Sequence, residues 1–295
     1  MTQRRTRPTL LALALPALAF PLAACGDDDA DGGKDTADTT TATATDTTST
    51  DTGADATHTP EGCALGLASG MSGTWAVTEV QTALVQVEPF GTMSQVSTSY
   101  YLARLGGGAT STIEMTLCAW ETEDDAKLFT TTMSAATLAS LDPFVRELHI
   151  ESRADGSIGY MAHEGFTLRG VELTDPATDT MPTEASDARV VDQDEDGEAG
   201  ISLVISGTLQ GKLFVAHRHK AAMDGCFTAA DRIAGLTDWT TDQVIFGSNP
   251  ASLSNTKPVA TTHPDDDLSH FEMVKVLDND DCAAIISKRA TLFPE

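Results

Sequence analysis

Apolar and polar side chains alternate along much of residues 61–295. Ile113, Met115 and Leu117 are separated by Glu and Thr, which is the pattern of a strand with one buried face. The same period of two, or enrichment in β-branched and aromatic residues, predicts further strands over residues 75–87, 94–105, 144–151, 166–173, 201–206, 212–219, 242–247 and 271–277. Many strands separated by Gly- and Asp-rich turns indicate an all-β protein, either an antiparallel β-sandwich or a barrel.

One or two short helices complete the predicted fold. Thr122 followed by Asp125 resembles an N-cap with an acidic first turn. Thr130 to Thr132 disfavour a long helix there, because Thr loses rotamer freedom in helices. A second helix is predicted over residues 135–141, ending before Pro143.

The first strand opens with the sequence Ser72-Gly73-Thr74-Trp75. This Gly-x-Trp resembles the start of a lipocalin-type barrel, in which the Trp plugs the barrel base. The resemblance covers three residues and implies a lipocalin-like barrel that carries an apolar ligand. The alternative is a Trp in the core of an ordinary sandwich.

The N-terminal residues have the three parts of an export signal. Three arginines at positions 4, 5 and 7 precede an apolar run over residues 10–22, and the run ends in Leu22-Ala23-Ala24-Cys25. About 13 apolar residues are too few for a membrane span, which needs roughly 20. The last four residues resemble the lipobox of bacterial lipoproteins, which implies acyl chains on the sulfur and amine of Cys25. We therefore expect an exported protein, lipid-anchored at the cell envelope, and Gly26 favours the outer over the inner membrane.

Residues 26–60 consist almost wholly of Thr, Asp, Ala and Gly, without an aromatic or large aliphatic residue. Such a segment cannot offset its own ordering entropy and is predicted to be disordered. The expected organisation is therefore a signal peptide over residues 1–24, the lipidated Cys25 with its tether over 25–60, and one β-rich globular domain over 61–295.

The chain is strongly acidic, with a formal net charge of −26 that becomes −29 once the three signal arginines are removed. This charge argues against nucleic-acid partners, because their binding depends on Lys and Arg at phosphates. It also disfavours docking on anionic lipid headgroups. The expected contact with the membrane is through the N-terminal acyl chains.

Four further cysteines, an even number in an exported domain, predict two disulfides. They are Cys63, Cys118, Cys226 and Cys282. Three pairings are possible and the sequence does not decide among them. The pairing of Cys63 with Cys118 and of Cys226 with Cys282 is favoured, closing loops of about 55 residues worth up to roughly 4 kcal/mol each on the chain-entropy model. No CxxC pair is present, which argues against thiol redox chemistry and zinc ribbons.

An acidic segment between two predicted strands is the best candidate for chemistry. Aspartates at alternate positions before a glycine can wrap several oxygens around a hard cation such as Ca²⁺. The candidate ligands are Asp192, Asp194, Asp196 and Glu198. The segment departs from an EF-hand, because its twelfth position is Leu203 and not a bidentate Glu. It resembles the Asp-rich calcium loops of extracellular β-proteins, and the alternative is a solvated acidic turn.

The ligand set of this segment is incomplete in sequence. Glu184 or Asp187 are close enough along the chain to supply a further oxygen. The hairpin that follows, over residues 201–219, makes the whole run resemble a module of uncharacterised bacterial lipoproteins. That resemblance implies no activity.

Other candidate sites are sparse. His217 and His219 leave the same face of a strand and could ligate zinc or copper, or they could mark where a buried face reaches solvent. No GxSxG, HExxH or phosphate-binding glycine loop is present. We therefore expect a non-enzyme.

Three functions remain open. The first is a binding or structural module at the envelope, stabilised by calcium if the acidic segment binds it, whose partner would be an envelope protein or polymer. The second is a lipocalin-like carrier of an apolar small molecule or lipid, which predicts a closed sheet with an interior pocket. The third is a hydrolase of envelope or extracellular polymers, which predicts a cleft with converging polar side chains.

Overall fold

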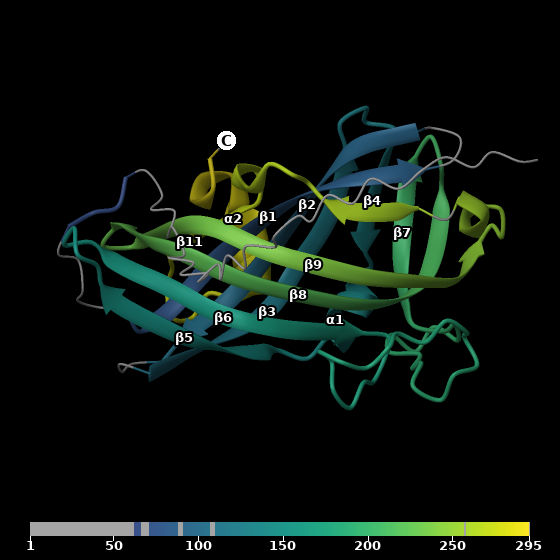
Figure 1. The fold of residues 1–295 in the computed structure, drawn as a ribbon, viewed down its shortest axis with the longest axis horizontal. Coiled ribbons are helices and arrows are strands. Elements are labelled where there is room, and N and C mark those ends of the chain that lie inside the picture. Colours follow the sequence, from purple (N-terminus) through teal and green to yellow (C-terminus); the bar gives the residue numbers. More distant parts are fainter. Residues whose placement is uncertain (1–61, 66–70, 88–90, 107–109, 257, 295) are drawn as a thin grey trace, which may run out of the picture. The chain divides into compact units, whose positions relative to one another are not determined.

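A computed structural model describes residues 62–65, 71–87, 91–106, 110–256 and 258–294. Within these residues the structure is built almost entirely from antiparallel strands (Figure 1), so the all-β prediction is confirmed. The predicted signal peptide, Cys25 and the tether lie outside the described residues.

The elements follow one another along the chain as a series of strands with few helices. The strands are β1 (Gly73–Val87), β2 (Gly91–Leu105), β3 (Thr110–Asp124), β4 (Phe129–Met133), β5 (Phe144–Ser152), β6 (Ile158–Arg169), β7 (Ile201–Gly207), β8 (Gly211–Ala229), β9 (Arg232–Asn249), β10 (Val259–Thr262) and β11 (His270–Lys275). The helices are α1 (Ala135–Ser140) and α2 (Cys282–Leu292), with short 3-10 turns η1 (Leu253–Thr256) and η2 (Asp266–Leu268).

The sheet closes on itself as a barrel. Going round, the strands β1, β2, β3, β5, β6, β8, β9 and β11 each pair antiparallel with the next, and β11 pairs with β1. The closing ladder runs from Trp75 opposite Lys275 to Val80 opposite His270. A closed ring leaves no unpaired edge along these ladders. Of the two predicted architectures, the chain therefore adopts the barrel.

The wall of the barrel changes along its length. β3 pairs first with β5 and farther along with β4, and β8 pairs with β7 at its start and with β6 beyond. β1 likewise pairs with β11 in its first half and with β10 in its second half. One end of the barrel, called the base, thus contains β5, β6 and β11, and the opposite end, called the mouth, contains β4, β7 and β10.

The apolar core fills the base. Trp75, Tyr160, Phe227, Phe271 and Met273 are at most 1 % exposed. The Trp75 ring lies edge-on to Phe227, with 6.4 Å between centroids, and its Nε1 donates to the carbonyl of Met71 at 3.0 Å. Trp75 therefore occupies the base of the barrel, the position that the Gly-x-Trp resemblance implied.

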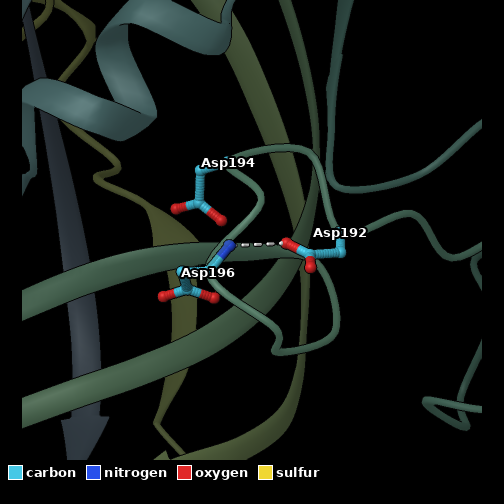
Figure 2. Close-up of side chains that lie close together, drawn as sticks. All are labelled: Asp192, Asp194 and Asp196. Carbon is cyan, nitrogen blue, oxygen red and sulfur yellow. Dashed lines mark hydrogen bonds between the residues drawn. The ribbon is translucent and has the colours of Figure 1, made fainter.

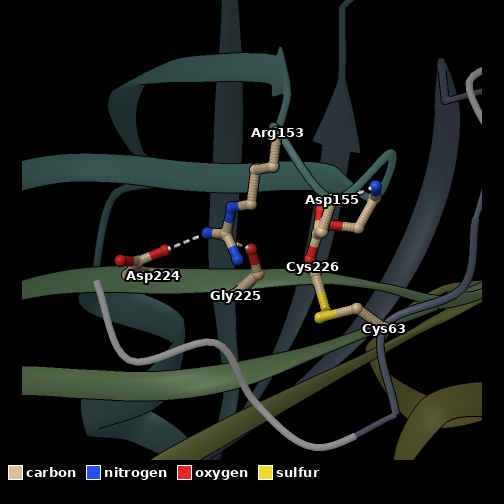
Figure 3. The surroundings of a disulfide bond; sticks show 7 residues. Cys63, Arg153, Asp155, Asp224, Gly225 and Cys226 are labelled. Carbon is tan, nitrogen blue, oxygen red and sulfur yellow. Dashed lines mark hydrogen bonds and ion pairs between the residues drawn. A yellow bond between two sulfur atoms is a disulfide. The ribbon is translucent and has the colours of Figure 1, made fainter. Parts of the chain in front are cut away.

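The two disulfides join Cys63 to Cys226 and Cys118 to Cys282, so the pairing predicted from loop length is wrong. The bonds span 163 and 164 residues, because the fold makes neighbours of segments that are far apart in the sequence. Figure 3 shows Cys63 bonded to Cys226 on β8, beside the ion pair of Arg153 with Asp224. Loop length constrains only the unfolded chain, whereas the pairing is decided by which strands are neighbours.

The predicted helix at Thr122 is absent, because residues 110–124 form β3 and the threonines that follow lie in β4. Asp124 closes the intervening turn by accepting hydrogen bonds from the backbone N–H groups of Leu128 and Phe129. The second predicted helix is confirmed as α1, where the Ser134 hydroxyl accepts from the Thr137 N–H at 3.0 Å.

Helix α2 was not predicted. Asp281 caps its first turn by accepting from the Ala284 N–H at 2.8 Å. Its single fully buried side chain, Ile285, packs with Ala76 and Leu102 on the outer face of β1 and β2. The disulfide between Cys282 and Cys118 on β3 also fixes the N-terminal end of α2.

Candidate functional site

The acidic segment is a folded turn that leads into β7. Gly200 forms a bridge with Asp192, and its N–H donates to the carbonyl of Val191 at 3.1 Å. Gly200 has a φ of +96°, and a side chain there would overlap the backbone carbonyl of Val215. The glycine is therefore required by close approach to β8 as well as by its left-handed backbone.

Three of the four predicted ligands come together. Asp192, Asp194 and Asp196 each place a carboxylate oxygen within 4.8 Å of the others (Figure 2). Asp194 accepts from the Thr137 hydroxyl at 2.7 Å and from the Ser202 N–H at 3.0 Å. Its other oxygen is buried without a hydrogen-bond partner among the described residues. The cluster thus presents oxygens of the kind that hard cations bind.

The negative charge of the three clustered aspartates is poorly balanced by nearby cations. Lys212 is the cation nearest to Asp196, at 3.5 Å, and this side chain is about half exposed. A hydrogen bond from the Ser202 hydroxyl, aided by Lys212, lowers the pKa of Asp196, which favours its charged form. Three carboxylates so close together repel one another, and a bound cation would relieve that repulsion.

The remaining predicted ligands do not join the cluster. Glu198 is exposed, and its contact with the cluster is made by its backbone N–H, which donates to Asp196. Asp187 forms an ion pair with Arg189, whose hydrogen bonds lower the pKa of Asp187 to about 2. Among the described residues, Glu184 is not part of the carboxylate cluster either.

A cavity of about 390 Å³ occupies the mouth of the barrel. Side chains at alternate positions of β1, β2, β3, β4, β7, β8 and β9 form its walls, as expected for the inner face of a barrel. Gln95, Ser97, Thr122 and Thr131 line the cavity from β2, β3 and β4 with polar side chains. The upper wall also carries aromatic and aliphatic side chains. These are Ala83, Val85, Val87, Trp120, Phe129, Leu203, Ile205, Leu209, Leu213, Trp239 and Leu253.

The floor of the cavity is polar. Gln81 bridges the barrel, with its Nε2 2.8 Å from Glu79 Oε1 and 3.2 Å from His219 Nε2. The Arg169 Nη1 donates to His217 Nδ1 at 3.0 Å. Because a guanidinium only donates, His217 Nδ1 carries no proton and this imidazole is neutral. We call Glu79, Gln81, Arg169, His217 and His219 the polar layer.

The polar layer separates the filled base from the cavity. Burial and, to a smaller extent, the neighbouring Arg169 lower the pKa of His217 to about 3. Burial, His217 and Arg169 also hold the pKa of His219 well below its usual range. On the opposite wall, burial and the nearby Glu79 raise the pKa of Tyr101 to about 12. Both histidines are therefore neutral at pH 7.

Acidification is expected to destabilise the fold through these histidines. Below about pH 6.5 an unfolded histidine binds a proton that buried His219 does not accept, so the unfolded state gains stability. Going from pH 7.5 to 5.5 should lower the free energy of unfolding by about 1.4 kcal/mol for each such histidine. Urea unfolding at both pH values measures this. His219→Gln should show a smaller pH dependence than wild type, and equal pH dependences would contradict the assignment.

Most of the polar layer was not predicted. Only His217 and His219 were noted, and the two rings stack with centroids 6.0 Å apart. Among the described residues, no Cys, Asp, Glu or further His places a ligand atom within 4.8 Å of both imidazoles, so a zinc or copper site is not supported. One sequence feature does indicate the polar layer. Trp75 and Val77 alternate along an inward-facing series, and Glu79 and Gln81 continue that series with polar side chains.

No protein-family model, curated protein or solved structure matches this chain. No helix among the described residues is both long and apolar enough to cross a membrane.

Proposed function

We propose that the protein is a lipid-anchored binding protein of the cell envelope that holds a small molecule in the mouth of its barrel. The cavity carries this proposal. Its volume of about 390 Å³ lies in the range of roughly 300–1,000 Å³ that is common for small-molecule sites. Trp120, Phe129 and Trp239 line it and would provide much apolar contact area to a ligand.

The cavity favours a carrier over the two alternatives. A purely structural module needs a filled core, whereas here a cavity of about 390 Å³ remains among the buried side chains of the mouth. A hydrolase that uses histidine as its general base needs an imidazole that accepts protons. His217 contacts the Thr241 hydroxyl, but its other nitrogen accepts from Arg169, whose positive charge opposes protonation. This arrangement makes His217 a poor general base.

Small-molecule binding is tested with an apolar fluorophore that brightens on leaving water, such as N-phenyl-1-naphthylamine. We expect wild type to bind it. Ala83→Trp should weaken binding at least tenfold, because Ala83 faces the cavity and a Trp would fill it. Gln86→Trp is the matched control, since Gln86 lies on the same strand and is exposed. Equal binding by both variants would contradict a site inside the barrel.

The location rests on the N-terminal residues. Acyl chains on Cys25 would hold the protein at the membrane, preferably the outer membrane, and several chains anchor far better than one. The tether over residues 26–60 would separate the barrel from the bilayer. Cys25→Ser should move the protein from the membrane fraction to the soluble fraction of an expressing bacterium, and a variant that stays in the membrane fraction would count against the anchor.

We also propose that the acidic cluster binds Ca²⁺ weakly, near the millimolar dissociation constants of extracellular modules. At 10 mM Ca²⁺ and a dissociation constant of about 1 mM, binding stabilises the fold by about 1.4 kcal/mol, or a few degrees in melting temperature. Asp194→Asn should abolish the calcium-dependent shift. Asp187→Asn should keep it, because Asp187 is paired with Arg189 outside the cluster. A shift that persists in Asp194→Asn would place the effect elsewhere.

A further inference from the structure

The interior of the barrel carries an excess of positive charge around the polar layer. Glu79 is completely buried, and Arg146 and Arg169 are 3 % and 5 % exposed. His217 and His219 are neutral, so two guanidinium groups face one carboxylate. The next buried carboxylate toward the mouth, Asp124, is engaged by the backbone of its own turn.

The two arginines differ in what they face. The three guanidinium nitrogens of Arg146 are buried without a hydrogen-bond partner in the described part of the chain, and this group lies over the Phe144 ring at 5.2 Å. Arg169 instead lines the cavity. Among the described residues its side chain makes one hydrogen bond, to His217, and no ion pair within 4.0 Å. Arg169 therefore directs a charged group with spare donors toward the ligand space.

Arg169 is close enough to feel the negative charge of Glu79 but makes no ion pair with it, and Arg146 is a second buried cation in the same interior. A buried cation that is only partly balanced is unfavourable, and a ligand anion at Arg169 would balance it. A guanidinium matches a carboxylate in shape and binds it with two parallel hydrogen bonds. Asp242 also lines the cavity, but its charge is balanced by the ion pair with Arg218. The excess around the polar layer therefore amounts to one positive charge, and no lysine among the described residues lines the cavity to support a second anion charge. The floor therefore fits a monoanionic head group better than a phosphate monoester.

The walls above the floor fit the rest of such a molecule. Above Arg169 the lining combines apolar side chains, among them Val85, Phe129 and Trp239, with polar ones such as Gln95 and Thr131. We infer that the ligand is an amphiphilic carboxylate, with its head group at Arg169 and its hydrocarbon or aromatic part against the upper wall. This inference rests on the proposed carrier function and names the class of its ligand.

The acidic exterior makes the inference specific. A net charge of −26 repels anions at long range, so it cannot attract a carboxylate to the protein. Preference for an anion over a neutral analogue must therefore arise from the polar layer itself. It should disappear when the positive charge of Arg169 is removed.

The test compares decanoate, decan-1-ol and decylamine, which share one chain and differ in head-group charge. Each is titrated into the protein by calorimetry at pH 7.5, below its aggregation limit. We expect decanoate to bind at least tenfold more tightly than decan-1-ol, and decylamine to bind most weakly. Equal affinities for decanoate and decan-1-ol would overturn the inference and leave the carrier function intact. Binding of none of the three, nor of the fluorophore, would overturn both.

Variants locate the preference. Arg169→Gln should lower the affinity for decanoate at least tenfold and change that for decan-1-ol by less than threefold. Arg169→Lys should retain part of the preference because it keeps the charge, and it provides a second test if the Gln variant does not fold. Arg104→Gln is the matched control, since Arg104 is exposed and pairs with Glu114 outside the cavity. An unchanged preference in folded Arg169→Gln would overturn the assignment.

Discussion

Replacing Trp75 with alanine is expected to lower the free energy of unfolding by about 3–5 kcal/mol. The ring is completely buried at the base, contacts Phe227 edge-on and donates its N–H to Met71. Removing it leaves a void that a closed barrel cannot collapse to fill, because each wall strand is held by ladders on both sides. Urea unfolding followed by far-UV circular dichroism measures the change without depending on Trp fluorescence.

Trp120→Ala is the matched control for this prediction. Trp120 is the same residue type, but it lines the cavity and is only partly buried. Its loss should cost less than half as much as that of Trp75. If both variants unfold with the same free energy, or if Trp75→Ala stays within 1 kcal/mol of wild type, the base is not the main source of stability.

Removal of the Cys118–Cys282 disulfide should cost about 2–5 kcal/mol. The bond spans 164 residues, so it strongly restricts the unfolded chain, and it also holds α2 against the barrel. We expect the double variant Cys118→Ser with Cys282→Ser to unfold at lower denaturant concentration than wild type under oxidising conditions. Both cysteines are replaced so that no free thiol remains.

Reduction provides an independent check of the disulfide prediction. Under a reducing agent, wild type and a variant with all four cysteines replaced should have similar stability. The variant without Cys63 and Cys226 should keep α2 resistant to proteolysis, because that bond is anchored on β8, whereas the helix is held by the Cys118–Cys282 bond and by the packing of Ile285 on Ala76 and Leu102. Loss of α2 protection in that variant, or full stability without the Cys118–Cys282 bond, would contradict the role assigned to this disulfide.

Local patterns predicted most strands but not their full lengths. β8 was expected to end at residue 219 and continues to Ala229, through Asp224 and Gly225. These residues normally favour turns, yet here Gly225 lies opposite Gly235 in the ladder between β8 and β9. A side chain at Gly235 would overlap the carbonyl of Asp224, so the glycines serve close backbone approach. A local sequence pattern cannot show that these glycines allow two strands to approach closely.

The two candidate sites differ in how far the sequence could reveal them. The acidic cluster was predictable because its aspartates are neighbours in the chain. The cavity was expected only as a consequence of the lipocalin resemblance, and its floor was not expected at all. Gln81, Arg169 and His217 belong to three strands and meet because the sheet closes. The spacing of residues along the chain does not reveal contacts between strands that are distant in sequence. The predicted disulfide pairing was wrong for the same reason.

The change of wall strands between base and mouth divides the molecule into two regions with separate constraints. Substitutions in β4, β7 and β10 alter the entrance without changing the ladders that enclose Trp75. Related chains could therefore diverge in ligand preference through these three short strands and keep a common stable half. The inward-facing positions of the long strands shared by both halves would then be the slowest to change, since these residues serve either packing or binding.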